Sequence, residues 1–140
     1  MQGKFLEELS VGQSAQLVRT VREADIVAFA QVTGDTNPVH LDADYAAKTS
    51  FGGRIAHGML SAGYISAVLG TTLPGPGAIY LSQTLKFKRP VRIGDEVTAV
   101  VTISEINEAK AQVTLATVCK VGGKAVVDGE AVVMVPRKAA

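Results

Sequence analysis

The chain has 140 residues, 47% of them hydrophobic and 19% charged, which is the size and balance of one globular domain. A chain of this length buries a core without metals or disulfides. Its 14 basic and 13 acidic side chains leave a formal net charge of +1, so no surface for nucleic acid or membrane is indicated. We expect a single domain over residues 1–140, with no nucleic acid and no membrane among its partners.

Three further features bear on the compartment. The N-terminal segment MQGKFLEELSVGQ lacks the apolar region of a secretory signal. Cys119 is the only cysteine, so no internal disulfide forms, and its place inside a predicted strand indicates a core residue. The longest apolar-rich stretch, residues 58–70, is too short to span a bilayer. Together these features favour a soluble, cytoplasmic protein.

In chain order, residues 13–21 predict a short strand. The segment READIVAFAQVTG predicts a helix over residues 23–33, ended by Gly34 in a left-handed conformation. The segment DADYAAKTS, from residue 42, predicts a short second helix. Residues 58–69 are small and apolar around the whole helical circumference, which is typical of a buried helix.

The second half predicts strands. Residues 80–88 alternate, with Leu81, Leu85 and Phe87 on one face, and Pro90 ends the pattern. Three longer alternating segments follow over residues 96–106, 111–121 and 124–135, the last two joined by a hairpin at Gly122-Gly123. Long strands joined by short turns predict an antiparallel meander, and the whole order predicts an α+β fold in which an antiparallel sheet covers a helix.

Apolar residues also recur on the second face of these strands. Examples are Val100, Val126, Val132 and Met134. A chain of this length has little else to cover that face. We therefore expect a partner subunit, most simply in a two-fold homodimer, with higher homo-oligomers left open.

The segment TGDTNPVH places Asp35 and His40 five positions apart in a loop rich in turn residues. As structure, it is an ordinary loop, because Asn, Asp and Pro all favour turns. As a site, Gly34 and Pro38 hold a general base and a histidine toward one point, with water as the reacting partner since no Ser or Cys is placed as a nucleophile. We expect no metal, because the chain has only two histidines and one cysteine, and no cofactor, because no dinucleotide or phosphate-loop motif is present.

The run FAQVTGDTNPVHLDADYA, residues 29–46, resembles the hydratase-2 motif of the MaoC-like (R)-specific enoyl-CoA hydratases. The downstream runs RIAHGMLSAGYISAVLG and IYLSQTLKFKRPVRIGDEV extend the resemblance over nearly the full chain. It implies the hot-dog fold, an antiparallel sheet wrapped around a long central helix. Since hot-dog proteins also include thioesterases, the fold alone does not assign the activity.

The resemblance implies reversible hydration of a trans-2-enoyl-CoA to an (R)-3-hydroxyacyl-CoA, with no cofactor beyond the substrate's own CoA. Asp35 would activate a water for attack at C3, and His40 would share that water and supply or relay a proton to C2. Asn37 would orient the loop and Ser66 would lie beside the pair. The Gly58 amide, at the start of the buried helix, would donate to the thioester oxyanion.

Other residues keep two interpretations. His57 contacts the substrate or fixes the loop, and we favour the second. Tyr64, Leu69 and Val132 shape an acyl pocket or belong to the core. A basic cluster meets the CoA phosphates or is a solvated strand end; it comprises Lys86, Lys88, Arg89 and Arg92. An acyl-CoA thioesterase and a non-catalytic acyl-thioester-binding subunit remain alternatives, and neither the acyl chain length nor the choice of CoA over a carrier protein follows from the sequence.

Overall fold

The computed structural model describes residues 2–138. Its strands are β1 (Ser14–Thr20), β2 (Ile79–Gln83), β3 (Lys86–Phe87), β4 (Glu96–Asn107), β5 (Gln112–Val121) and β6 (Lys124–Met134). Its helices are α1 (Glu23–Thr33), α2 (Pro38–Leu41), α3 (Ala43–Ala47) and α4 (Gly58–Thr71), preceded by one 3₁₀ turn, Leu6–Glu8. Among these residues, no helix is long and apolar enough to cross a membrane.

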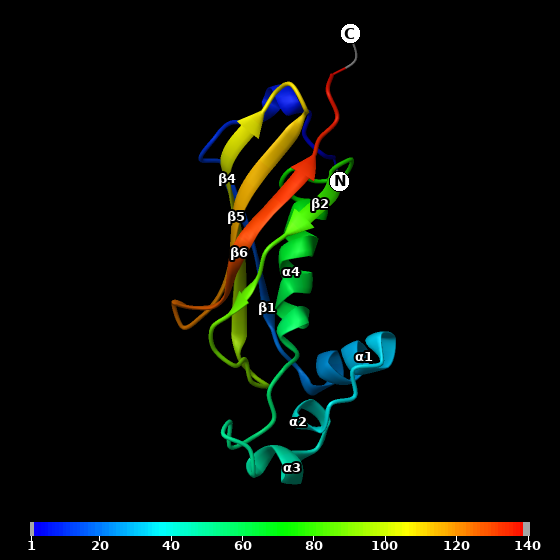
Figure 1. Cartoon of the computed structure of the whole chain (residues 1–140), viewed down its shortest axis with the longest axis vertical. Helices are drawn as coiled ribbons and strands as arrows, with labels where there is room; N and C mark the ends of the chain where they lie inside the picture. The colour runs from blue at the N-terminus through cyan, green and yellow to red at the C-terminus, as the bar shows by residue number, and fades with distance from the viewer. Residues whose placement is uncertain (1, 139–140) are drawn as a thin grey trace.

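The strands form one antiparallel sheet in the order β1-β4-β5-β6-β2, with β3 also paired to β6, and α4 lies along one face of it (Figure 1). The predicted meander of β4, β5 and β6 is confirmed. Gly122 and Gly123 both have positive φ, 57° and 79°, as a tight hairpin between twisted strands requires. The sheet wrapped along one long helix is the hot-dog arrangement that the resemblance implied.

The core lies between α4 and the sheet. Its inward side chains on β4 alternate as predicted: Val97, Ala99, Val101 and Ile103 are all buried. They meet Ile65, Val68 and Leu69 of α4 in one apolar cluster. The prediction that α4 is buried all round is wrong for a single chain, because the sheet covers only one side and leaves Gly63, Ser66 and Gly70 exposed.

Two details of the strand prediction are also wrong. The strand expected over residues 80–88 is interrupted between β2 and β3. At this point the carbonyl oxygen of Thr84 approaches Gly129 so closely that a Cβ there would lie 1.8 Å from it. Val126, expected on the outer face, is buried with 2% exposure. A register shift between Cys119 and Lys120 turns both Val126 and Val127 toward the core.

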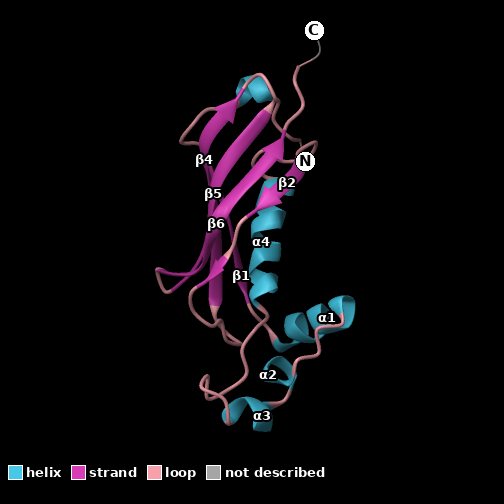
Figure 2. Ribbon diagram, viewed as in Figure 1, coloured by secondary structure: helices cyan, strands magenta, loops and turns pink. Residues whose placement is uncertain are grey.

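Residues 23–57 form a separate cap beyond the N-terminal end of α4, where α1, α2 and α3 lie together (Figure 2). The predicted helix α1 is confirmed at its exact bounds, and Gly34 ends it with a left-handed φ of 81°. The predicted short helix after it is confirmed as α3. The helix α2 between them was not predicted, and it carries His40.

Candidate functional site

Local backbone chemistry positions Asp35 and His40. Gly34 turns the chain out of α1, and the Asp35 side chain accepts a hydrogen bond from the Asn37 amide at 3.3 Å. Asn37 then caps α2 through its side-chain oxygen, which lies 3.2 Å from the amide nitrogen of Val39. Pro38 is the first residue of α2, where its missing N–H costs nothing. The Asn-Pro pair was therefore a helix-start signal, which we interpreted only as a turn.

His40 is buried, with 8% exposure, and its ring orientation is defined. Its Nδ1 lies 2.7 Å from the carbonyl oxygen of Ile55. Since a carbonyl only accepts, Nδ1 carries the hydrogen, and Nε2 of the neutral ring keeps its lone pair for chemistry. This is the tautomer that a general base or proton relay needs.

Arg54 holds α2 from behind, and sequence reasoning missed it. Its Nε donates to the carbonyl oxygen of His40 at 2.7 Å, and its terminal nitrogen pairs with the Glu23 carboxylate at 2.6 Å. The Arg54 side chain is only 15% exposed. No local sequence pattern indicates this contact, because its partners lie 14 and 31 positions away.

His57 completes the cluster. It is 2% exposed, and its Nε2 lies 2.9 Å from the carbonyl oxygen of Asp35. Its ring stacks on that of His40, with centroids 3.8 Å apart, and tilts against Phe29 at 4.6 Å. These contacts support the loop-fixing interpretation of His57.

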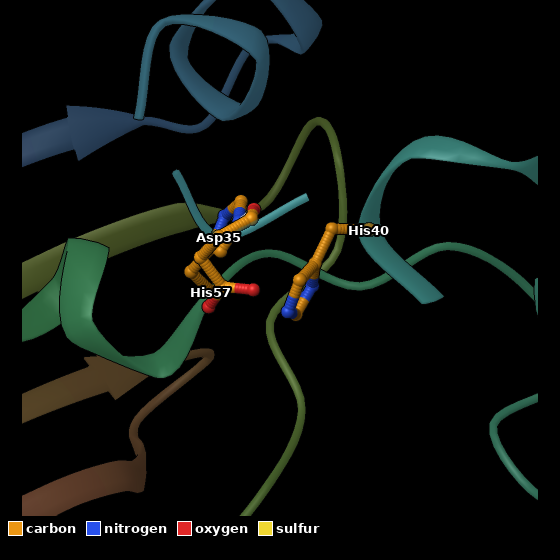
Figure 3. A group of neighbouring side chains, drawn as sticks. All are labelled: Asp35, His40 and His57. Atoms are coloured by element: carbon orange, nitrogen blue, oxygen red, sulfur yellow. The ribbon is translucent and has the colours of Figure 1, made fainter. Parts of the chain in front are cut away.

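Three side chains therefore gather where the loop after α1, the helix α2 and the start of α4 meet (Figure 3). One ligand-type atom each of Asp35, His40 and His57 lies within 4.8 Å of the others. Stacked imidazoles direct their nitrogen lone pairs side by side rather than toward one ion, and one nitrogen on each ring already meets a carbonyl. The arrangement suits acid–base chemistry better than metal ligation, and the absence of a metal stays a prediction.

Gly58 is the first residue of α4 and is exposed. A Cβ at this position would lie 2.5 Å from the ring of Phe87, so only glycine fits against that ring. The N–H of a first helical residue has no intrahelical acceptor, and it lies at the positive end of the helix dipole. The amide of Gly58 is thus placed to stabilise a negative oxygen, as the sequence suggested.

His40 and Gly58 line one groove of about 350 Å³. Phe51, Met59 and Phe87 give it apolar walls, and the groove continues to Lys88 and Arg89. Lys88 forms an ion pair with Asp128 at 3.2 Å, and Arg89 donates to the carbonyl oxygen of Ala125 at 2.6 Å. One half of the predicted basic cluster therefore lies at the groove, partly engaged by the protein itself.

The remaining predicted residues do not gather at this cluster within one chain. Ser66 is exposed on α4 and lines a second groove, between α4 and β2, that reaches Phe29 and Met59. Tyr64 lines a third, beside α1 and β1. Leu69 is buried in the core with 2% exposure, and Val132 is half-buried on β6. Their site and pocket roles stay predictions.

The shifted pKa values of Cys119 and Tyr64, both outside the cluster, bear on the predicted roles of these residues. Burial raises the pKa of Cys119 to about 12, so this thiol is no nucleophile at neutral pH, and it donates to the carbonyl oxygen of Ser61 within the core. Burial, and then the nearby Asp25 carboxylate, raise the pKa of Tyr64. The expectation that Cys119 is a core residue is confirmed.

Comparison with known proteins gives consistent results. The family model described as a MaoC-like domain matches residues 7–126. A Rhodospirillum rubrum protein named (R)-specific enoyl-CoA hydratase is 59% identical, over 96% of this chain and 93% of its own length. A Methylorubrum extorquens protein named 3-hydroxybutyryl-CoA dehydratase is 52% identical, over 96% and 85%. The solved structure of R-hydratase PhaJ1 from Pseudomonas aeruginosa superposes with a TM-score of 0.92 at 50% identity, covering 97% of this chain and 88% of that one.

Proposed function

Because the chain belongs to the MaoC-like domain family, we propose that it is an (R)-specific enoyl-CoA hydratase. The reaction is the reversible addition of water to a trans-2-enoyl-CoA, giving an (R)-3-hydroxyacyl-CoA. The names of the two relatives, at 59% and 52% identity, support this assignment. The observation that carries it is the position of His40, which lies within 4.8 Å of the Asp35 carboxylate, keeps Nε2 free and lines one groove together with Gly58 at the start of α4.

In the mechanism, a water lies between the Asp35 carboxylate and Nε2 of His40. Asp35 takes a proton from this water while the oxygen bonds to C3 of the enoyl group. The electron pair of the double bond moves toward C2 and the thioester oxygen. His40 then relays through Nε2 the proton that Asp35 took from the water, and C2 receives it, so the enzyme returns to its starting state. Buried His40 holds its orientation through Ile55, whereas the Asp35 side chain is exposed and open to water.

The charge that develops on the thioester oxygen needs a donor fixed in place. The amide of Gly58 supplies it from the N-terminal end of a 14-residue helix. Loss of such a donor typically costs about 3 kcal/mol in the transition state. Gly58→Pro removes the N–H, and full turnover by that variant would contradict the assignment.

The thioester handle is CoA. The groove that holds His40 and Gly58 runs between the rings of Phe51 and Phe87 toward Lys88 and Arg89. Apolar walls suit the pantetheine arm, and the two cations suit phosphate groups. A carrier-protein thioester turned over faster than its CoA counterpart would argue against this choice.

The active form is a homodimer in the cytoplasm. Exposed apolar side chains line the groove between α4 and β2: Met59, Tyr80 and Leu81. The strand β2 ends the sheet and leaves one backbone edge unpaired. A second copy placed there would cover the exposed side of α4, including Ser66, and close the groove between α4 and β2 into an acyl pocket. Leu69 faces the core of its own chain and would not line that pocket. Sedimentation at micromolar concentration tests this, and a monomer that is fully active would contradict it.

The function is tested by mixing the protein with crotonyl-CoA and following the absorbance of the conjugated thioester together with free thiol. Hydration removes the absorbance without releasing thiol. A thioesterase would release thiol, and a non-catalytic binding subunit would change neither signal. Asp35→Asn, assayed in parallel, separates turnover at this loop from contaminating activity.

A further inference from the structure

We propose that His57 is a positioning residue that fixes Asp35, His40 and the start of α4 relative to one another. The inference rests on the proposed function for the reaction but concerns a residue that this function leaves without a role. His57 is the N-cap residue of α4, directly before Gly58, and it contacts both members of the acid–base pair.

His57 does not line the groove that His40 and Gly58 line, which argues against a direct role toward substrate. The His57 side chain is 2% exposed, whereas Gly58 beside it is exposed. The imidazole contacts the ring of Phe29 in α1 and the ring of His40 in α2. A ligand in the groove therefore meets His40 and Gly58, while His57 acts only through them.

The first contact fixes the base. The carbonyl oxygen of Asp35 can only accept, so Nε2 of His57 donates to it over 2.9 Å. This bond holds the backbone of Asp35 immediately after the left-handed Gly34, at the point where the chain leaves α1. The Asp35 carboxylate is exposed, and its hydrogen bond to the Asn37 amide is long at 3.3 Å. The position of the Asp35 side chain therefore depends mainly on the hydrogen bond from His57 to the Asp35 backbone.

The second contact fixes the imidazole of His40. Its hydrogen bond to Ile55 defines one ring nitrogen, but a single bond leaves the ring free to tilt about that direction. The contact with the His57 ring, at 3.8 Å and 30°, limits that tilt while one ring nitrogen of His40 lies within 4.8 Å of an Asp35 carboxylate oxygen.

The ring of His57 is itself held by few polar contacts. Across residues 2–138, its Nδ1 is the one buried side-chain nitrogen or oxygen without a protein hydrogen-bond partner. The bond from Nε2 is thus its only polar anchor, and its ring plane is otherwise held by the contacts with the rings of His40 and Phe29. The two contributions can be removed one at a time.

Three variants separate them. His57→Gln keeps a flat donor of similar reach, His57→Phe keeps the stacked ring but removes the donor, and His57→Ala removes both. Cys119→Ala is the matched control, because Cys119 is buried under α4 and lies outside the site. Thermal melting and sedimentation show which proteins are folded, and rates are expressed per folded enzyme.

We expect His57→Phe to lower kcat for crotonyl-CoA by roughly 100-fold, as a displacement of about 1 Å in a catalytic group does. KM stays within about twofold of wild type, because the lost interaction matters mainly in the transition state. His57→Gln recovers most of the kcat, His57→Ala is slower than both, and Cys119→Ala keeps the wild-type kcat.

Equal kcat values for wild type, His57→Phe and His57→Gln would overturn the proposal, as would melting temperatures that fall while kcat per folded enzyme does not. A rise in KM at constant kcat would overturn it too, since that identifies a substrate contact. If wild type itself does not hydrate crotonyl-CoA or a longer enoyl-CoA, the proposed function fails instead, and the variants then report only on stability.

Discussion

Different interactions hold two regions of the molecule together: one region is the sheet with α4, and the other is the cap of residues 23–57. In the first region, inward side chains such as Val101, Leu115 and Ile65 are apolar and fully buried in one cluster. In the cap, few side chains are buried, and hydrogen bonds to backbone carbonyls connect segments far apart in sequence. Burial is non-directional and gives stability, whereas hydrogen bonds are directional and give position.

This difference separates the expected effects of mutation. Substitutions in the sheet and α4 should change the free energy of unfolding while leaving kcat per folded enzyme nearly intact. Substitutions in the cap should change kcat more than stability. A catalytic defect from a distant core mutation, or a stability defect from an exposed cap residue, would break the comparison.

The largest effect is expected for Asp35→Asn. The amide cannot take a proton from water, so kcat should fall by about 10²–10⁴-fold, the usual contribution of a general base. The melting temperature should hardly change, because the Asp35 side chain is exposed. Asp44→Asn, an exposed carboxylate on α3, is the control and should keep full activity.

The next effect is on stability alone. Ile65 is fully buried between α4 and the sheet, so Ile65→Ala should cost about 2–5 kcal/mol of unfolding free energy through lost contacts and a cavity. Ile65→Val should cost only about 0.5–1.5 kcal/mol. Urea unfolding measures both. Loss of kcat in the folded fraction would contradict the separation between the two regions.

Arg54→Ala should affect both properties moderately. It leaves the carbonyl oxygen of His40 without its 2.7 Å donor, which costs about 1–3 kcal/mol for a buried acceptor. The substitution should also displace α2 by less than about 1 Å, which should lower kcat by about tenfold. Arg22→Ala, which removes an exposed ion pair on the same segment, should change neither activity nor melting temperature.

The smallest effect concerns Cys119. Burial raises its pKa from 9.0 to about 12, so at pH 8 the native thiol is neutral and should not react with a thiol reagent. Because the folded pKa lies above the unfolded one, the related stability is complete below pH 9 and is lost as pH rises toward 12. Rapid labelling of the native protein at pH 8 would contradict the burial of this strand.

The two regions also differ in what their sequences reveal. The meander and α4 follow from alternation and helical periodicity, because inward burial imposes those periods on each segment separately. The interruption between β2 and β3 cannot be predicted in this way, since it lies where Thr84 meets Gly129 across the sheet. The register shift that buries Val126 is equally a property of two paired strands.

In the cap, the loop sequence predicted only part of the local structure. Gly34 was correctly interpreted as a helix end, whereas Asn37-Pro38 was interpreted as a turn although it also starts a helix. The loop residues suggested Asp35 and His40 as an acid–base pair, and their separate roles at C3 and C2 came from family resemblance. The contacts of Arg54 and His57 were out of reach, because each joins residues brought together only by the fold.

The most direct test of the central claim is the product formed from crotonyl-CoA. Wild-type protein should give (R)-3-hydroxybutyryl-CoA, consumed by an (R)-specific and not an (S)-specific 3-hydroxyacyl-CoA dehydrogenase, with no free thiol released and almost none of this product from Asp35→Asn. An (S) product, release of CoA, or an undiminished rate in Asp35→Asn would contradict the account.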